Sequence, residues 1–159
     1  MKEVLIKLYG FEELTDKAKD KARDWWRRGD SFAWEAESRQ SIEAYANHFH
    51  VKLLDWSVDD CIYHYRTDAE NANFRGMKLA HFKRDYMPTG YCLDCYMWEA
   101  FYDAFKATGD AKHAFFEGLD AGFRGWRDDM AYQLSDEYIE EYLVSNDYEF
   151  MEDGSRARY

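Results

Sequence analysis

The sequence has a single proline, three cysteines and no long run of apolar residues. A membrane-spanning helix needs roughly 18 to 20 apolar residues, and none of the segments approaches that length. The N-terminal segment MKEVLIKLYG lacks the pattern of a secretory signal peptide. An odd number of cysteines without such a signal argues against a disulfide framework and is typical of a reducing cytosol. We therefore expect a soluble, intracellular protein.

Aromatic residues are abundant, at 19% of the chain, with 6 Trp, 13 Tyr and 11 Phe. They supply enough apolar surface to offset the entropy of ordering the chain, although one third of the residues are charged. A length of 159 residues without a Pro- or Ser-rich linker favours one domain over residues 1–159.

Hydrophobic periodicity predicts an α+β fold with a small antiparallel sheet and several helices. Thr15 is a good N-cap for a helix that stops near Gly29. The other predicted elements are an N-terminal strand over 3–9, a helix over 31–49, strands over 51–56 and 61–66, and helices over 94–105 and 111–134.

The C-terminal region concentrates the negative charge of the chain. Residues 128–153 contain ten acids without one Lys or Arg, in a chain whose net charge is -11. Ser135 is a good N-cap for a short acidic helix, and Asp153-Gly154 is typical of a hairpin turn. The candidate partner-binding residues on this helix and hairpin are Asp136, Glu137, Glu140, Glu141, Asp147, Glu149, Glu152 and Asp153.

Two interpretations of these acids stay open. They form either a highly soluble surface or a rigid array that imitates the phosphates of a nucleic acid. In the second case the partner is a basic, nucleic-acid-binding surface of another protein, and the acids steer the encounter and replace phosphate contacts. Neither direct nucleic-acid binding, membrane binding nor a cofactor is expected, and the oligomeric state is left open.

Aromatic side chains are reserve candidates for the interface, because Tyr and Trp are typical hot spots. They are Trp25, Trp26 and Tyr138. The segment WWRR, residues 25–28, could stack on bases, but the nearby Asp20, Asp24 and Asp30 argue against a nucleic-acid groove.

A zinc-stabilised regulatory or interaction protein is the first alternative. The segments CIYH and CLDC contain Cys61, His64, Cys92 and Cys95, a ligand set that could close a tetrahedral site. If 61–66 is a strand, however, Cys61 and His64 point to opposite faces, which favours ordinary thiols.

A small enzyme without a recognisable motif is the second alternative. The sequence contains no Gly-rich phosphate loop after a strand, no H-E-x-x-H and no Ser or Cys in a recognised nucleophile motif. An enzyme would need a pocket with converging polar groups.

Two segments resemble a family of small acidic proteins encoded by tailed bacteriophages and related mobile elements. They are FEELTDKAKDKARDWWR, residues 11–27, and LSDEYIEEYLVSNDYEFMEDG, residues 134–154. The resemblance carries over no catalytic or binding residues. It implies a phage accessory protein in the cytoplasm of a bacterial host, acting as a non-enzymatic anti-CRISPR or antirestriction inhibitor.

Overall fold

The computed structural model describes residues 1–29 and 31–158 and has an α+β fold with two small antiparallel sheets. The predicted fold class is confirmed. The helices are α1 (Asp16–Arg27), α2 (Glu35–His48), α3 (Cys92–Thr108), α4 (Ala111–Gln133) and α5 (Asp136–Ser145). The strands are β1 (Tyr9–Gly10), β2 (Leu53–Val58), β3 (Tyr63–Thr67) and β4 (Glu149–Phe150). The 3-10 turns are η1 (Phe11–Glu13), η2 (Ala69–Asn71) and η3 (Leu79–His81).

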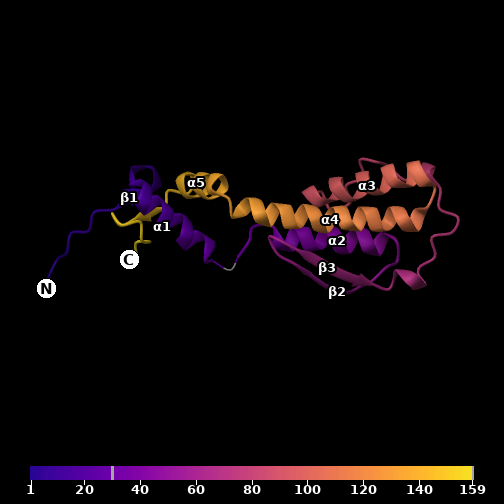
Figure 1. Cartoon of the computed structure of the whole chain (residues 1–159), viewed down its shortest axis with the longest axis horizontal. Coiled ribbons are helices and arrows are strands. Elements are labelled where there is room, and N and C mark those ends of the chain that lie inside the picture. Colours follow the sequence, from indigo (N-terminus) through magenta and orange to yellow (C-terminus); the bar gives the residue numbers. More distant parts are fainter. Residues whose placement is uncertain (30, 159) are drawn as a thin grey trace. The chain divides into compact units, whose positions relative to one another are not determined.

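The chain forms two compact units, and Figure 1 labels helices and strands of both. The terminal unit comprises residues 1–32 and 132–159 and contains α1, α5, β1 and β4. The central unit, residues 33–131, contains α2, α3, β2, β3 and almost all of α4. That the whole chain is one domain stays a prediction.

Both predicted N-caps of the terminal unit are present. The Thr15 hydroxyl accepts a hydrogen bond from the Ala18 N–H at 3.3 Å, and the Ser135 hydroxyl accepts one from the Tyr138 N–H at 3.2 Å. Each satisfies an N–H group that has no partner within the first turn of its helix. The helices α1 and α5 therefore begin where their local sequence predicts.

The core of the terminal unit joins segments from both ends of the chain. Its buried residues are Phe11, Leu14, Ala18, Ala22, Ile139, Leu143 and Phe150. The strands β1 and β4 pair beside it, with Tyr9 opposite Phe150 and Gly10 opposite Glu149. A small apolar core thus fixes the positions of α1 and α5 against each other.

The predicted N-terminal strand over 3–9 is wrong for all but its last residue. Val4 and Leu5 are 78% and 101% exposed, and residues 1–8 lie outside any strand. Alternating apolar residues form a stable strand only against a partner, and β4 offers just two residues for pairing.

The predicted turn at Asp153-Gly154 is confirmed. The Gly154 N–H donates to the Met151 carbonyl at 2.9 Å, and Phe150 and Arg156 form an antiparallel bridge. Gly154 has a φ of 82°, and a Cβ at this position would lie 2.0 Å from the Ala18 carbonyl oxygen. Only glycine therefore allows the turn to lie directly against α1.

In the central unit, α2 and α3 contact each other, α4 packs against both, and the rings of the β2–β3 hairpin pack on α4 (Figure 1). The two predicted strands form this hairpin, shifted by about two residues, with Trp56 opposite Tyr65. The Asp59 carboxylate closes the turn by accepting the N–H groups of Cys61 and Ile62, both at 2.8 Å. These two bonds hold the pKa of Asp59 below its ordinary value.

Stacked and edge-on rings fill the core of the central unit. Phe49 contacts Trp98, Phe101 and Phe115 at centroid distances of 5.6, 4.9 and 5.2 Å. The buried Tyr45 hydroxyl donates to the Phe115 carbonyl at 2.9 Å. The buried ring of Phe49, at the end of α2, therefore contacts both α3 and α4. Aromatic side chains of this kind pack the core of the central unit.

Two helices of the central unit begin at other residues than predicted. The helix expected over 31–49 begins at Glu35, because Trp34 takes a left-handed conformation with φ 65°. The helix expected over 94–105 begins at Cys92, where the buried Asp94 carboxylate accepts the N–H groups of Thr89 and Gly90, both at 2.9 Å.

Candidate functional site

Ion pairs within the terminal unit hold Asp136, Glu140 and Asp153, which are among the predicted partner-binding acids. Arg23 on α1 pairs with Asp136 and Glu140 on α5, and Lys21 pairs with Asp153 in the hairpin turn. Arg27 adds a second pair to Asp136. These carboxylates already have cationic partners, so they contribute less to an outward field than the sequence indicates.

Arg23 is the centre of this network, because its side chain is only 14% exposed. Burial by itself lowers the pKa of Arg23, but the hydrogen bond to Asp20 and the charges of Asp136 and Glu140 raise it above its ordinary value. The hydrogen bond from Lys21 likewise holds the pKa of Asp153 well below its ordinary value. The pairs join α1 to the acidic segments of the terminal unit.

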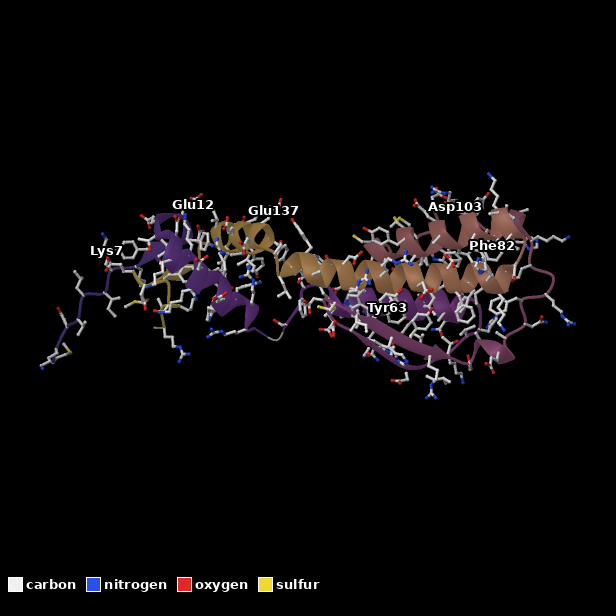
Figure 2. The ribbon with its side chains drawn as sticks, viewed as in Figure 1. Lys7, Glu12, Tyr63, Phe82, Asp103 and Glu137 are labelled. Carbon is white, nitrogen blue, oxygen red and sulfur yellow. The ribbon has the colours of Figure 1, made fainter. Side chains whose placement is uncertain are left out.

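The other face of α5 carries acids that point to solvent. Glu137 and Glu141 are exposed, and Figure 2 shows Glu137 at the outer edge of α5. No cation pairs with either residue in the part of the chain that the structure describes. Val144 continues the same helix face at the i+7 position from Glu137. The helix thus presents unpaired carboxylates in a row along its axis.

This row leads to a pocket of about 300 Å³ at the end of α5, which Val144 helps to line. Four acids line the pocket: Glu12 and Glu13 from η1, and Asp147 and Glu149 from the segment that follows α5. Asp147 takes a left-handed conformation with φ 51°, which turns the chain from α5 into β4. We call Glu12, Glu13, Glu137, Glu141, Asp147 and Glu149 the acidic track.

Glu12 and Glu13 were not among the sequence candidates. They lie more than a hundred residues from Asp147 in the sequence, and only the pairing of β1 with β4 brings them to the same pocket. The Glu13 carboxylate also accepts the Gly10 N–H at 2.7 Å, which fixes its position. Among the predicted acids, Glu152 is exposed in the hairpin turn and does not line this pocket.

The reserve aromatic candidates differ in exposure. Trp26 packs on Tyr142 at a centroid distance of 4.5 Å and is partly buried with the core. Tyr138 contacts Tyr132 and Tyr142 and is half-buried. Trp25 is 38% exposed, so it is the reserve candidate with the most accessible ring.

The structure does not bring the four predicted zinc ligands together. Among the described residues, the one cluster of three ligand-type side chains within 4.8 Å is Asp59, Asp60 and Cys61. Cys61 lies in the exposed β2–β3 turn, where its thiol contacts the Asp60 carboxylate at 3.6 Å, and this contact raises its pKa. Cys95 instead lies 3.7 Å from the sulfur of Met87. The set Cys61, His64, Cys92 and Cys95 therefore does not form a tetrahedral site in this structure.

The central unit contains a second hollow, a groove of about 910 Å³ between α2, α3 and α4. Exposed rings of Trp34 and Tyr96 line it, together with Arg124 and several acids. Two of these acids, Glu99 and Asp103, pair with Arg84. The described lining includes Cys92 but no histidine, so it offers no Cys–His pair for nucleophilic catalysis.

No family model, curated protein or solved structure matches this chain. None of the described helices combines the length and the apolar character needed to cross a bilayer.

Proposed function

We propose that this protein is a non-enzymatic inhibitor that binds a basic, nucleic-acid-binding surface of another protein through the acidic track. The observation that carries the proposal is the separation of the acids into two groups. Asp136, Glu140 and Asp153 are paired internally, whereas Glu137 and Glu141 face solvent and have no cationic partner among the described residues. Unpaired carboxylates on a fixed helix are complementary to a surface evolved to hold phosphates.

The spacing of the charges supports partial imitation of a phosphate backbone. Four residues along α5 correspond to a rise of about 6 Å, the separation of Glu137 and Glu141 along the helix axis. One strand of duplex DNA carries a charge about every 3.4 Å of axis. The carboxylates of α5 alone are therefore more widely spaced than the phosphates of one DNA strand. The four acids of the pocket at the end of α5 raise the charge density there.

Rigidity is the second support. The α5 backbone is held by a buried core that includes Ile139 and Leu143, and by the ion pairs of Arg23. Carboxylates on a preorganised helix lose little conformational entropy on binding apart from that of their own side chains. Binding would exclude DNA from the basic surface without any chemical step.

The biological setting follows from the resemblance of residues 11–27 and 134–154 to phage accessory proteins. The proposed target is a CRISPR–Cas effector or a restriction enzyme in the cytoplasm of the bacterial host. Such proteins bind DNA largely through Lys and Arg contacts to phosphates, which an acidic track would occupy.

The test is affinity capture from bacterial lysate with three forms of the full chain. They are the wild type, the charge-reversal variant E137K/E141K, and the matched control E70K/D85K, which reverses two exposed acids of the central unit. The proposal predicts a nucleic-acid-binding protein retained by the wild type and the control, lost by E137K/E141K, and eluted by duplex DNA. If all three forms retain the same proteins, the acidic track is only a soluble surface.

A further inference from the structure

A basic groove of about 660 Å³ lies in the terminal unit, between α1 and the segment that follows the hairpin turn. Its lining contains the cations Lys17, Lys21, Arg28, Arg156 and Arg158, the acids Asp20 and Asp24, and the exposed ring of Trp25. Such a gathering of cations is unexpected in a chain with a net charge of -11. The groove is separate from the acidic track, with which it shares no lining residue.

Both acids of the groove have cationic partners. Asp20 pairs with Arg23, and Asp24 pairs with Arg27 at 3.4 Å. Conversely, one of the five cations, Lys21, pairs with Asp153. Within the described chain, which excludes Asp30, no carboxylate pairs with the other four cations: Lys17, Arg28, Arg156 and Arg158. The groove therefore has positive charge that none of the described carboxylates neutralises by an ion pair.

Arg156 is fixed at the groove by aromatic rings. Its guanidinium lies 4.6 Å from the ring centroid of Tyr148 and 5.9 Å from that of Trp25. One of its nitrogens donates to the Glu149 carbonyl at 2.6 Å. A guanidinium has five N–H donors, so this bond leaves others to bind a ligand. Because the side chain is already positioned, ordering it on binding costs little entropy.

Trp25 provides a flat apolar surface beside these cations. Its ring is held by Tyr148 and Phe150 at centroid distances of 6.0 and 6.2 Å, and it remains 38% exposed. The planar guanidinium group of arginine can donate paired hydrogen bonds to phosphate oxygens, and an exposed indole ring can stack on another planar ring. The volume of the groove is within the range of small-molecule sites.

We propose that this groove binds a nucleoside phosphate, with Arg28, Arg156 and Arg158 on the phosphates and Trp25 on the base. A nucleotide carries both features that the groove complements, a compact anion and a planar ring. A nucleic-acid strand is the poorer occupant, because the acidity of the whole chain repels an extended polyanion. This site is independent of the inhibitory function proposed for the acidic track.

Isothermal titration calorimetry of the full chain tests the proposal. The probes are ADP, GDP, CDP and UDP, with inorganic phosphate, adenosine and a single-stranded oligonucleotide as comparisons. At least one diphosphate is expected to bind with a dissociation constant below about 1 mM and more tightly than phosphate or adenosine. Absence of diphosphate binding overturns the proposal. So does binding of the oligonucleotide alone, or of phosphate as tightly as the best diphosphate.

Two variants locate the site. R28Q/R158Q removes two exposed cations that have no carboxylate partner in the part of the chain that the structure describes, and it should weaken diphosphate binding at least about tenfold. The matched control R66Q/K112Q removes two exposed cations of the central unit and should leave affinity unchanged. Equal affinities of the two variants overturn the proposal.

The variant W25L tests the stacking contact separately, because leucine keeps an apolar side chain but lacks a ring. A loss of about fivefold or more in diphosphate affinity, with an unchanged circular dichroism spectrum, supports stacking on Trp25. Unchanged affinity of a folded W25L overturns the assignment of the base to Trp25. R28Q/R158Q tests the phosphate side of the site even if W25L does not fold.

Discussion

Arg23 on α1 forms an ion pair with Glu140 on α5, across a separation of 117 residues in the sequence. The pair explains why part of the acidic C-terminal segment faces inward to another helix. It also separates the acids that are paired within the terminal unit from those that have no cationic partner among the described residues. Glu140 belongs to the first group and Glu141, its neighbour in the chain, to the second.

Replacing Arg23 with methionine should therefore loosen α1 and α5 while keeping the apolar part of the side chain. We expect the free energy of unfolding of the terminal unit to fall by about 1 kcal/mol, because the partner carboxylates are partly exposed and can be hydrated once unpaired. Hydrogen exchange of α1 and α5 amides should accelerate about fivefold where it proceeds through opening of the unit. The control R28M removes a cation at the end of the same helix that pairs with no described carboxylate, and it should change stability by less than about 0.5 kcal/mol. Equal effects of R23M and R28M would contradict the structural role of the pair.

Gly154 should tolerate no side chain. Alanine at this position would bring a Cβ to 2.0 Å from the Ala18 carbonyl oxygen, in a backbone conformation with φ 82°. We expect G154A to lower the free energy of unfolding of the terminal unit by more than about 2 kcal/mol. G109A is the control, because Gly109 has a φ of 69° but open space around it, and it should cost about 1 kcal/mol. Urea unfolding measures both, and similar costs would show that the close approach to α1 is unimportant.

Three glycines on α4 should respond to alanine in a fixed order. A Cβ on Gly118 would lie 2.0 Å from the Tyr45 hydroxyl oxygen and 2.8 Å from the Met97 carbonyl oxygen. At Gly122 the nearest atom, at 2.5 Å, is the sulfur of the flexible Met97 side chain, and at Gly125 it is the ring of the exposed Tyr96. G118A should therefore cost about 2 to 3 kcal/mol, and G122A less. G125A should be nearly neutral, because a gain in helix propensity of about 1 kcal/mol offsets the contact. Thermal unfolding of the three variants gives the order, and a G125A that costs as much as G118A contradicts it.

His48 should make the central unit less stable at acidic pH than at neutral pH. Burial against Trp98 and the charge of the nearby His50 lower the pKa of His48 from its ordinary value of 6.5. Because the folded state binds a proton less readily than the unfolded state, this contribution is complete above pH 6.5 and is lost as pH falls from there through the lower pKa of the folded state. H48F keeps the aromatic contact and should flatten the dependence of the urea midpoint on pH between pH 8 and pH 5. The effect is small because His48 is partly exposed, and an unchanged slope would exclude His48 as its source.

Local signals predicted the helices well. The caps at Thr15 and Ser135 and the turn at Asp153-Gly154 depend on residues within about four positions of each other. They could therefore be predicted from the local sequence. The helix predicted over 31–49 starts too early, because Trp34 takes a left-handed conformation that aromatic residues rarely adopt.

Contacts between distant segments account for what the sequence could not predict. The periodicity of residues 3–9 predicts a strand, but strand formation depends on how many residues β4 offers for pairing. In the same way, a run of acids does not reveal which of them meet Arg23 or Lys21 from the other end of the chain. The place of Glu12 and Glu13 in the acidic track, and the basic groove around Trp25, likewise required the structure.

The central claim is that the unpaired acids of α5 exclude DNA from a partner, and inhibition of DNA cleavage tests it most directly. A restriction enzyme or CRISPR–Cas effector that the capture experiment identifies is purified, and its cleavage of plasmid DNA is measured with increasing amounts of wild type, E137K/E141K or E70K/D85K. The account predicts that wild type and E70K/D85K inhibit cleavage equally, that E137K/E141K does not, and that excess non-cleavable duplex DNA weakens binding of the inhibitor. Full cleavage in the presence of bound wild type, or equal inhibition by all three proteins, would contradict it.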